Sequence, residues 1–162
     1  MISVARTPLK KLLGMAVRSE IDSNRIYTEL VNRVKNPLLR EKFSILAFEE
    51  KKHKEVLENL FDVLYQGEKM EIPKKTEEAL LPSIHLSPSS TLAQILYQAM
   101  DSEKAAQNFY ASLAKRVKAP KKRILDYLSK VEKSHYMMLR SEYVLALQFE
   151  DYAEKDIDKV VT

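Results

Sequence analysis

The sequence predicts an all-α protein, a bundle of four helices in which a long crossover connection joins two helical hairpins. Glycine occurs only twice in 162 residues, and the chain is 45% hydrophobic and 31% charged. That composition favours helix and supplies enough apolar side chains for the core of one domain. Apolar residues also recur at alternating spacings of three and four in four long segments, as one buried face of a helix requires.

Residues 7–65 are expected to form the first hairpin. Thr7 is a good helix N-cap and Pro8 suits the first helical position. Asn36 and Pro37 repeat this signal, so the first helix ends there and the second begins within a residue or two. A turn this short makes the two helices antiparallel neighbours. Gly67 predicts that the second helix ends near residue 65.

Residues 66–90 are expected to be the crossover. Pro73, Pro82, Pro88 and several serines exclude a continuous helix there. The second helix is roughly 40 Å long at ~1.5 Å per residue. About 25 extended residues span that length, so the segment can connect opposite ends of the bundle.

Residues 91–149 are expected to form the second hairpin. Thr91 and Gln94 have the spacing of a capping box at its start. Ala119 and Pro120 predict the tight break between its two helices. The charged tail, residues 150–162, is expected to be a short terminal helix or frayed.

Composition also excludes several classes of protein. With no cysteine, the chain has no disulfides, thiolate zinc sites or cysteine-ligated iron–sulfur centres of its own. No signal-like or membrane-spanning apolar run is present, so we expect a cytoplasmic protein without stable membrane insertion. The net charge is +4, but Lys and Arg alternate with Glu, which is typical of a solvated helix surface and argues against nucleic-acid binding.

One polar pair interrupts the apolar face of the second helix. Glu50 and His53 are three residues apart and therefore share a face one turn apart. Around them the same face carries Leu39, Phe43, Leu46, Leu57, Leu60 and Leu64. Burying a carboxylate and an imidazole there costs several kcal/mol, roughly, unless each has a partner or a metal.

The second half of the chain repeats the first, including its polar interruptions. Pairs 83 positions apart are Glu20 and Glu103, Asn24 and Gln107, Tyr27 and Tyr110, Val34 and Val117, and Pro37 and Pro120; pairs 82 apart are Glu50 and Glu132, and His53 and His135. Each hairpin thus has a Glu on its first helix and Glu-x-x-His on its second. Counted from the turns, all six groups lie within about one helical turn of the same level, so we expect them to meet in the core.

Four carboxylates in an apolar core repel one another unless some are protonated or cations lie between them. Two metal ions resolve the repulsion, and a set of carboxylates and imidazoles suits iron or manganese. The alternative is a buried polar network satisfied by its own hydrogen bonds, which the excess of carboxylates balances poorly.

This arrangement resembles the ferritin-like di-iron superfamily, most nearly a rubrerythrin-like domain; Glu from two helices with Glu-x-x-His from the other two is the ligand pattern of such dimetal bundles. The resemblance implies two iron ions, or an iron–manganese pair. It implies that Glu50 and Glu132 bridge the metals. Glu20, Glu103, His53 and His135 would be the remaining ligands, with Tyr27 and Tyr110 donating hydrogen bonds to ligands.

The resemblance also implies an oxidoreductase that reacts with hydrogen peroxide or dioxygen. Because the cysteine-bearing module of full-length rubrerythrins is missing, electrons would come from a separate donor such as a rubredoxin-like protein. Rubrerythrins often carry an extra Glu where this chain has Ala106, with Ser23 at the first-helix equivalent. Two alternatives therefore stay open: a ferroxidase or iron-storage protein of a ferritin-like assembly and, ranked lower, a di-iron hydroxylase. We expect a homodimer or a larger homo-oligomer.

For several residues near the six, the sequence leaves alternatives open. Asn24 and Gln107 either hydrogen-bond a ligand or point to the bundle edge; Glu142 is expected near the rim of the bundle, and the alternative is a part in the site. Glu49 is expected to be solvated because it points about 100° away from Glu50. His85 is expected at the surface; Met137 and Met138 are expected to pack in the core.

Overall fold

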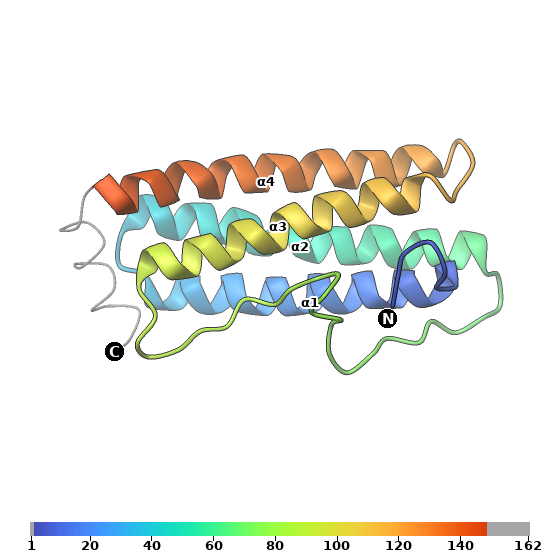
Figure 1. The fold of residues 1–162 in the computed structure, drawn as a ribbon, viewed down its shortest axis with the longest axis horizontal. Helices are drawn as coiled ribbons and strands as arrows, with labels where there is room; N and C mark the ends of the chain where they lie inside the picture. Colours follow the sequence, from blue (N-terminus) through green and yellow to red (C-terminus); the bar gives the residue numbers. More distant parts are fainter. Residues whose placement is uncertain (1, 149–162) are drawn as a thin grey trace.

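The computed structural model describes residues 2–148, and it confirms the all-α four-helix bundle. The helices are α1 (Leu9–Arg33), α2 (Pro37–Leu64), α3 (Leu92–Ala114) and α4 (Lys122–Gln148) (Figure 1). No strand occurs between residues 2 and 148.

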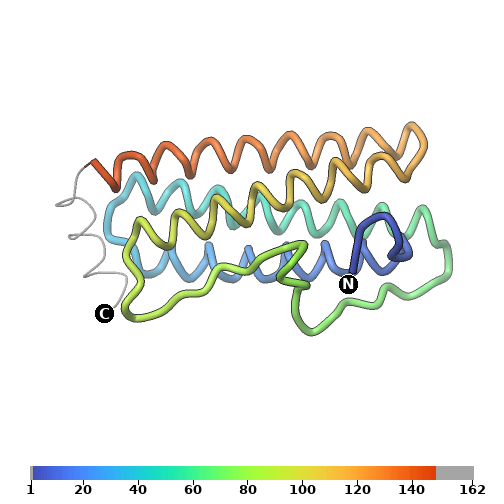
Figure 2. Tube along the Cα trace, in the orientation of Figure 1, coloured from blue at the N-terminus to red at the C-terminus, as the bar shows by residue number. Residues whose placement is uncertain are grey.

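The crossover returns along the bundle, as its length requires. It leaves the end of α2, follows α1 and reaches the start of α3 at the opposite end (Figure 2). As a result α2 and α4 are antiparallel neighbours, each belonging to a different hairpin. The dense packing lies within the hairpins, between α1 and α2 and between α3 and α4, whereas α2 and α4 approach each other less extensively.

Two predicted helix starts are confirmed in atomic detail. The side chain of Asn36 accepts hydrogen bonds from the backbone N–H groups of Leu38 and Leu39, at 3.0 and 3.1 Å, with Pro37 in the first turn. Thr91 and Gln94 form both halves of the capping box. Beyond the end of α2 at Leu64, Gly67 has a φ of +80°, which only glycine adopts without strain.

Two predicted helix boundaries are wrong. Pro8, not Thr7, occupies the N-cap position of α1, and no side chain caps this helix. Pro8 has an extended ψ of 136°, so the helix begins one residue later. The chain before it is held as a turn, and Arg116 donates to the carbonyl oxygen of Thr7 at 2.6 Å. The break around Pro120 is also wider than expected, because α3 ends at Ala114 and α4 begins only at Lys122.

The apolar core consists of two clusters, one toward each end of the bundle. One includes Tyr27, Leu30, Phe43 and Leu96; the other includes Val17, Leu57, Phe61, Tyr110 and Leu128. In every helix the residues between these clusters include the predicted polar ones. The bundle is therefore apolar, then polar, then apolar along its length.

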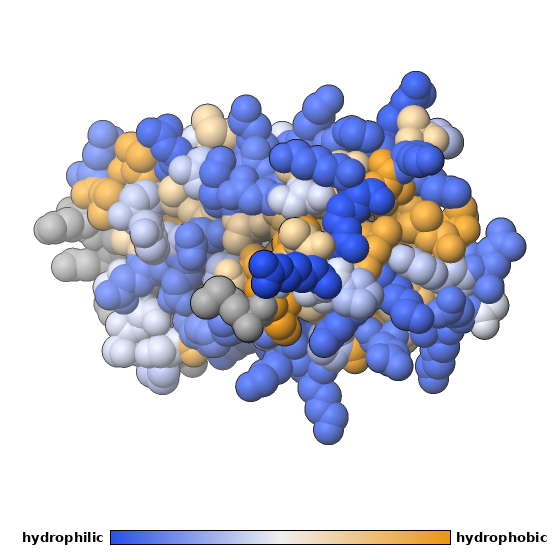
Figure 3. Space-filling view, turned by 45° about the vertical axis from the view of Figure 1, so that its right-hand side comes forward, coloured by the Kyte–Doolittle hydropathy of each residue, from blue (hydrophilic) through white to orange (hydrophobic). Residues whose placement is uncertain are grey.

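The surface is mainly hydrophilic; apolar side chains are most extensive on the right of the face in Figure 3, with smaller groups in its middle and on its left. Exposed large apolar residues include Leu38, Phe48, Tyr97, Tyr127 and Leu147. Among residues 2–148, no helix is long and apolar enough to cross a membrane.

Candidate metal centre

Six polar side chains form the layer between the two apolar clusters. They come from all four helices: Glu20 from α1, Glu50 and His53 from α2, Glu103 from α3, and Glu132 and His135 from α4. None is more than 4% exposed. The structure thus brings together all six residues that the sequence singled out, although their role as metal ligands stays a prediction.

The six residues fall into two groups that share two carboxylates. Ligand atoms of Glu20, Glu50, His53 and Glu132 lie within 4.8 Å of one another, and so do those of Glu50, Glu103, Glu132 and His135. Glu50 and Glu132 belong to both groups, which is the arrangement that bridging carboxylates between two ions would need.

Both histidines turn the Nδ1 atom toward the carboxylates. His53 Nδ1 lies 2.9 Å from Glu132 and 3.7 Å from Glu20. His135 Nδ1 lies 3.0 Å from Glu50 and 3.4 Å from Glu103. The two rings stack with their centroids 5.5 Å apart, so the histidines stand side by side.

Two buried tyrosines connect the hairpins through hydrogen bonds to this layer. Tyr27 on α1 donates to Glu103 on α3, and Tyr110 on α3 donates to Glu20 on α1. Burial and the neighbouring carboxylates raise the pKa of both phenols well above the usual value, so both hydroxyls keep their protons. Each tyrosine therefore donates to the carboxylate of the opposite hairpin, and the two equivalent positions of the repeat make equivalent contacts.

The carboxylates have unequal electrostatics. Burial, together with repulsion from the neighbouring carboxylates, raises the pKa of Glu50 well above its usual value and that of Glu132 to about 8. Burial also opposes ionisation of Glu20 and Glu103. The neighbouring Glu50, the His53 imidazole and the Tyr110 hydroxyl nevertheless hold the pKa of Glu20 below its usual range, and His135, Glu132 and Tyr27 do the same for the pKa of Glu103.

The imidazoles respond to the same carboxylates. Burial alone would lower the pKa of His53, yet the carboxylates of Glu132 and Glu20 raise it to about 10. The pKa of His135 is raised further for the same reason, chiefly by Glu103, Glu132 and Glu50. In the metal-free protein, protons therefore take the place of cations at this layer.

Those protons satisfy the layer only in part. Glu50 Oε1, both oxygens of Glu132, and the Nδ1 atoms of His53 and His135 are buried without a hydrogen bond of good geometry, although the imidazole and carboxylate atoms lie as close as 2.9 Å. All of them are possible metal-ligating atoms at the shared centre, and buried polar atoms are normally paired. The donor set therefore fits two cations better than it fits a self-satisfied polar network.

Comparison with known proteins shows the family of the chain. The family model described as rubrerythrin matches residues 11–143, which contain every helix-borne residue of the layer. The chain belongs to the rubrerythrin family. A similar solved structure is a hypothetical protein from Pyrococcus furiosus, which is 32% identical and superposes with a TM-score of 0.80, covering 92% of this chain and 98% of that one. No curated protein is significantly similar to the chain.

In this rubrerythrin-family chain, Glu49 makes a contact that the sequence did not predict. Its side chain is 41% exposed, but its carboxylate accepts a hydrogen bond from Nε2 of His135. Glu49 is thus partly exposed to solvent, as predicted, but it also has a buried partner that the sequence did not reveal. Glu49 lies on the side of α2 that faces α4, which the helical angle alone could not reveal without the positions of the neighbouring helices.

Within residues 2–148, neither the Asn24 nor the Gln107 side chain hydrogen-bonds any of the six residues; the Gln107 side chain accepts from Lys104 on its own helix. The amide of Asn24 donates to the carbonyl oxygen of Ala47 on α2 at 2.6 Å. In the second hairpin, the backbone oxygen of Gln107 accepts from Ser129 on α4 at 2.9 Å. Of the two alternatives for these side chains, a hydrogen bond to one of the six residues is not found between residues 2 and 148.

Three further predictions are decided by the structure. Glu142 is only 4% exposed, not at an open rim, and forms an ion pair with Lys42 on α2. His85 is at the surface as expected, 3.7 Å from Glu78. Met138 packs against the core, whereas Met137 is 48% exposed, so packing explains only one of the two methionines.

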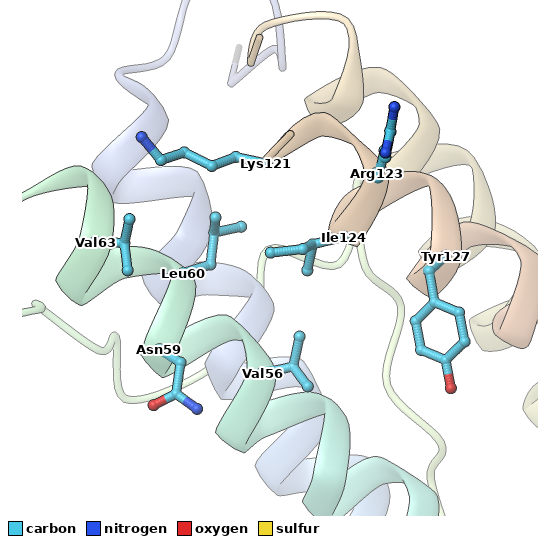
Figure 4. A pocket seen from close by; sticks show the side chains of 8 residues that line it. All are labelled: Val56, Asn59, Leu60, Val63, Lys121, Arg123, Ile124 and Tyr127. Carbon is cyan, nitrogen blue, oxygen red and sulfur yellow. The ribbon is translucent and has the colours of Figure 1, made fainter. Parts of the chain in front are cut away.

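A surface groove lies away from the metal centre. It is formed by the last turns of α2 and the first turns of α4 and is lined by Val56, Asn59, Leu60, Val63, Lys121, Arg123, Ile124 and Tyr127 (Figure 4). None of the six buried Glu and His residues lines it. The groove therefore gives no direct access to the centre.

Proposed function

We propose that the chain is a dinuclear iron oxidoreductase that reacts with hydrogen peroxide or dioxygen. The observation that supports this most strongly is the pair of four-residue groups that share Glu50 and Glu132. Each group could hold one ion, and the two groups contain buried oxygen and nitrogen atoms that lack a hydrogen bond of good geometry.

Each position would be held by one histidine and one unshared carboxylate in addition to the shared pair. His53 and Glu20 would hold one ion, and His135 and Glu103 the other. When bound, the two irons supply the redox chemistry by cycling between their ferrous and ferric states.

The remaining work is done by the protein. Tyr27 and Tyr110 fix the orientation of Glu103 and Glu20 through their hydroxyl groups. The apolar clusters on both sides exclude bulk water from the layer. In the free protein, His53 and Glu132 hold protons, and these must leave when cations take their place.

Electrons would come from a separate protein. The chain has no cysteine and therefore no cysteine-ligated redox centre that could deliver them internally. A rubredoxin-like protein is the kind of donor that suits a rubrerythrin-family chain, and its reduction of the ferric protein can be followed by stopped-flow absorbance.

Anaerobic titration with ferrous iron tests the proposal. We expect about two ions per chain and an absorbance change when peroxide is added. The double variant Glu50→Ala, Glu132→Ala should lose both, while Glu58→Ala, which removes a surface carboxylate that pairs with Lys54, should keep both. Wild-type protein that binds no iron above background contradicts the proposal.

The second candidate is a ferroxidase or iron-storage protein. It is favoured by Ala106, a buried residue of α3 that offers no extra carboxylate and leaves the six groups alone. Turnover that is fast with peroxide and slow with dioxygen supports the peroxidase; the reverse supports the ferroxidase. Light scattering adds the size of the assembly, because a storage protein requires a large shell and not a dimer.

A further inference from the structure

The internal repeat fails at the position just before the shared glutamates. Glu49 precedes Glu50 in the first half, whereas Val131 precedes Glu132 in the second. A residue that could hydrogen-bond a histidine of the opposite hairpin is thus present on α2 but not on α4. The two halves of the centre are chemically unequal for this reason.

The two histidines differ accordingly. His135 uses Nδ1 toward Glu50 and Glu103, and its Nε2 donates to Glu49. His53 uses Nδ1 in the same way, but within residues 2–148 no hydrogen bond reaches its Nε2.

A carboxylate on the outer nitrogen changes how an imidazole binds a metal. It holds the proton on Nε2, leaves the lone pair on Nδ1 and fixes the plane of the ring. It also makes the ligating nitrogen more basic. The hydrogen bond to Glu49 fixes the orientation of the His135 ring before a metal binds. The His53 ring has no such bond within the described part of the chain, so metal binding at His53 costs more conformational entropy.

We propose that Glu49 is a positioning residue that makes the two metal positions unequal. The position at Glu103 and His135 binds its ion first and more tightly, and the position at Glu20 and His53 fills second. This inference rests on the proposed two-metal function and deepens it, because it states which of the two positions binds its ion first and more tightly.

Glu49 is suited to a direct test because it is partly exposed. Its substitution leaves the six buried residues and both apolar clusters in place, so the fold should survive. Circular dichroism and the thermal midpoint of each metal-free variant check that it does.

The experiment is a titration of the metal-free full-length protein with Co²⁺, monitored by calorimetry and by visible absorption. For the wild type we expect two successive affinities. Glu49→Ala should weaken the tighter one by about 10- to 100-fold and leave the weaker one unchanged. Glu49→Gln should lose less, because its amide oxygen still accepts from Nε2 of His135.

Two further backgrounds identify which position is affected. In His53→Ala the remaining site should still weaken when Glu49 is replaced by Ala, whereas in His135→Ala the same replacement should change nothing. Val131→Glu supplies the missing carboxylate and should bring the weaker affinity toward the tighter one. The control is Glu58→Gln. It replaces another carboxylate of α2, one that lies outside the metal centre, and this variant should bind Co²⁺ like the wild type.

The inference is overturned if the wild type binds two ions with equal affinity, if Glu49→Ala changes neither affinity, or if it lowers both equally. Failure of Val131→Glu to strengthen the weaker position also contradicts it. Wild-type protein that binds no Co²⁺ would instead contradict the proposed function itself, so the two failures are distinguishable.

Discussion

At the scale of single residues, the hydroxyl groups of Tyr27 and Tyr110 each connect the two hairpins through one buried hydrogen bond. Each is buried and donates to a carboxylate that carries charge. Hydrogen bonds to charged groups contribute about 1.5–3 kcal/mol, and loss of one leaves a buried carboxylate short of a partner. Their effect on stability should therefore be large for a single oxygen atom.

Tyr110→Phe tests this expectation. The free energy of unfolding of the metal-free protein should fall by about 1–3 kcal/mol, measured by denaturant titration, because Glu20 loses its donor. Tyr127→Phe is the matched control: Tyr127 is 60% exposed, and its variant should unfold like the wild type. Equal stabilities for all three proteins would show that the Tyr110 bond contributes nothing.

Proton release on metal binding follows from the residue pKa values. At neutral pH, His53 with a pKa of about 10 and His135 with a raised pKa both hold a proton, as does Glu132 with a pKa of about 8. Metal and proton compete for these atoms, so metal affinity should rise with pH from ~6 to ~8. Calorimetry in buffers of different ionisation enthalpy should detect release of at least about two protons per chain. Affinity that is independent of pH would be inconsistent with these pKa values.

The identity of the six residues was predictable from the sequence because they interrupt an apolar pattern and do so twice. Glu50 and His53 stand out against the leucines of α2, and the repeat confirms the choice. Glu49 was not predictable in this way. Its contact with His135 depends on how α2 and α4 face each other across two hairpins, and a helical period describes only one helix at a time.

At the scale of elements, local signals predicted helix starts best where a side chain makes the cap. Asn36 and Thr91 cap α2 and α3 as expected, since each bonds backbone groups within three residues. Thr7 does not cap α1; its carbonyl oxygen instead accepts a hydrogen bond from Arg116, which follows the end of α3. Short-range chemistry was thus predictable, and a boundary set by tertiary contacts was not.

The crossover is fixed to α1 at a glycine. A methyl group on Gly14 would lie 2.0 Å from the carbonyl oxygen of Glu71, which is backbone and cannot rotate away. Gly14→Ala should therefore displace the crossover and lower the free energy of unfolding by about 1–3 kcal/mol, despite the better helix propensity of alanine. Thermal unfolding measures the loss, and limited proteolysis should show faster cleavage between residues 66 and 90. An unchanged or higher midpoint would mean that the crossover does not depend on this contact.

At the scale of the whole molecule, apolar packing stabilises the metal-free bundle, whereas repulsion among the central carboxylates destabilises it. The apolar clusters at both ends press four helices together, while the central layer gathers four carboxylates that share protons with two imidazoles. The hairpins are well packed internally, but α2 and α4 meet less extensively and are bridged by polar contacts such as Lys42 with Glu142. Association of the two hairpins is therefore the step that depends most on the central charges.

Metal binding should remove this repulsion and stabilise the whole fold. An ion present at a free concentration 100 times its Kd contributes about 2.7 kcal/mol per site, provided that the unfolded chain does not bind it. For a chain of this size each kcal/mol corresponds to roughly 2–4 °C, so filling one position should raise the Tm by about 5–10 °C and filling both should raise it further. Scanning calorimetry with and without Co²⁺ measures the shift, and Glu50→Ala, Glu132→Ala is the control because it removes the carboxylates common to both groups. A wild-type Tm that does not respond to the ion, or a variant that responds as strongly as the wild type, would show that the six residues do not bind metal in the folded bundle.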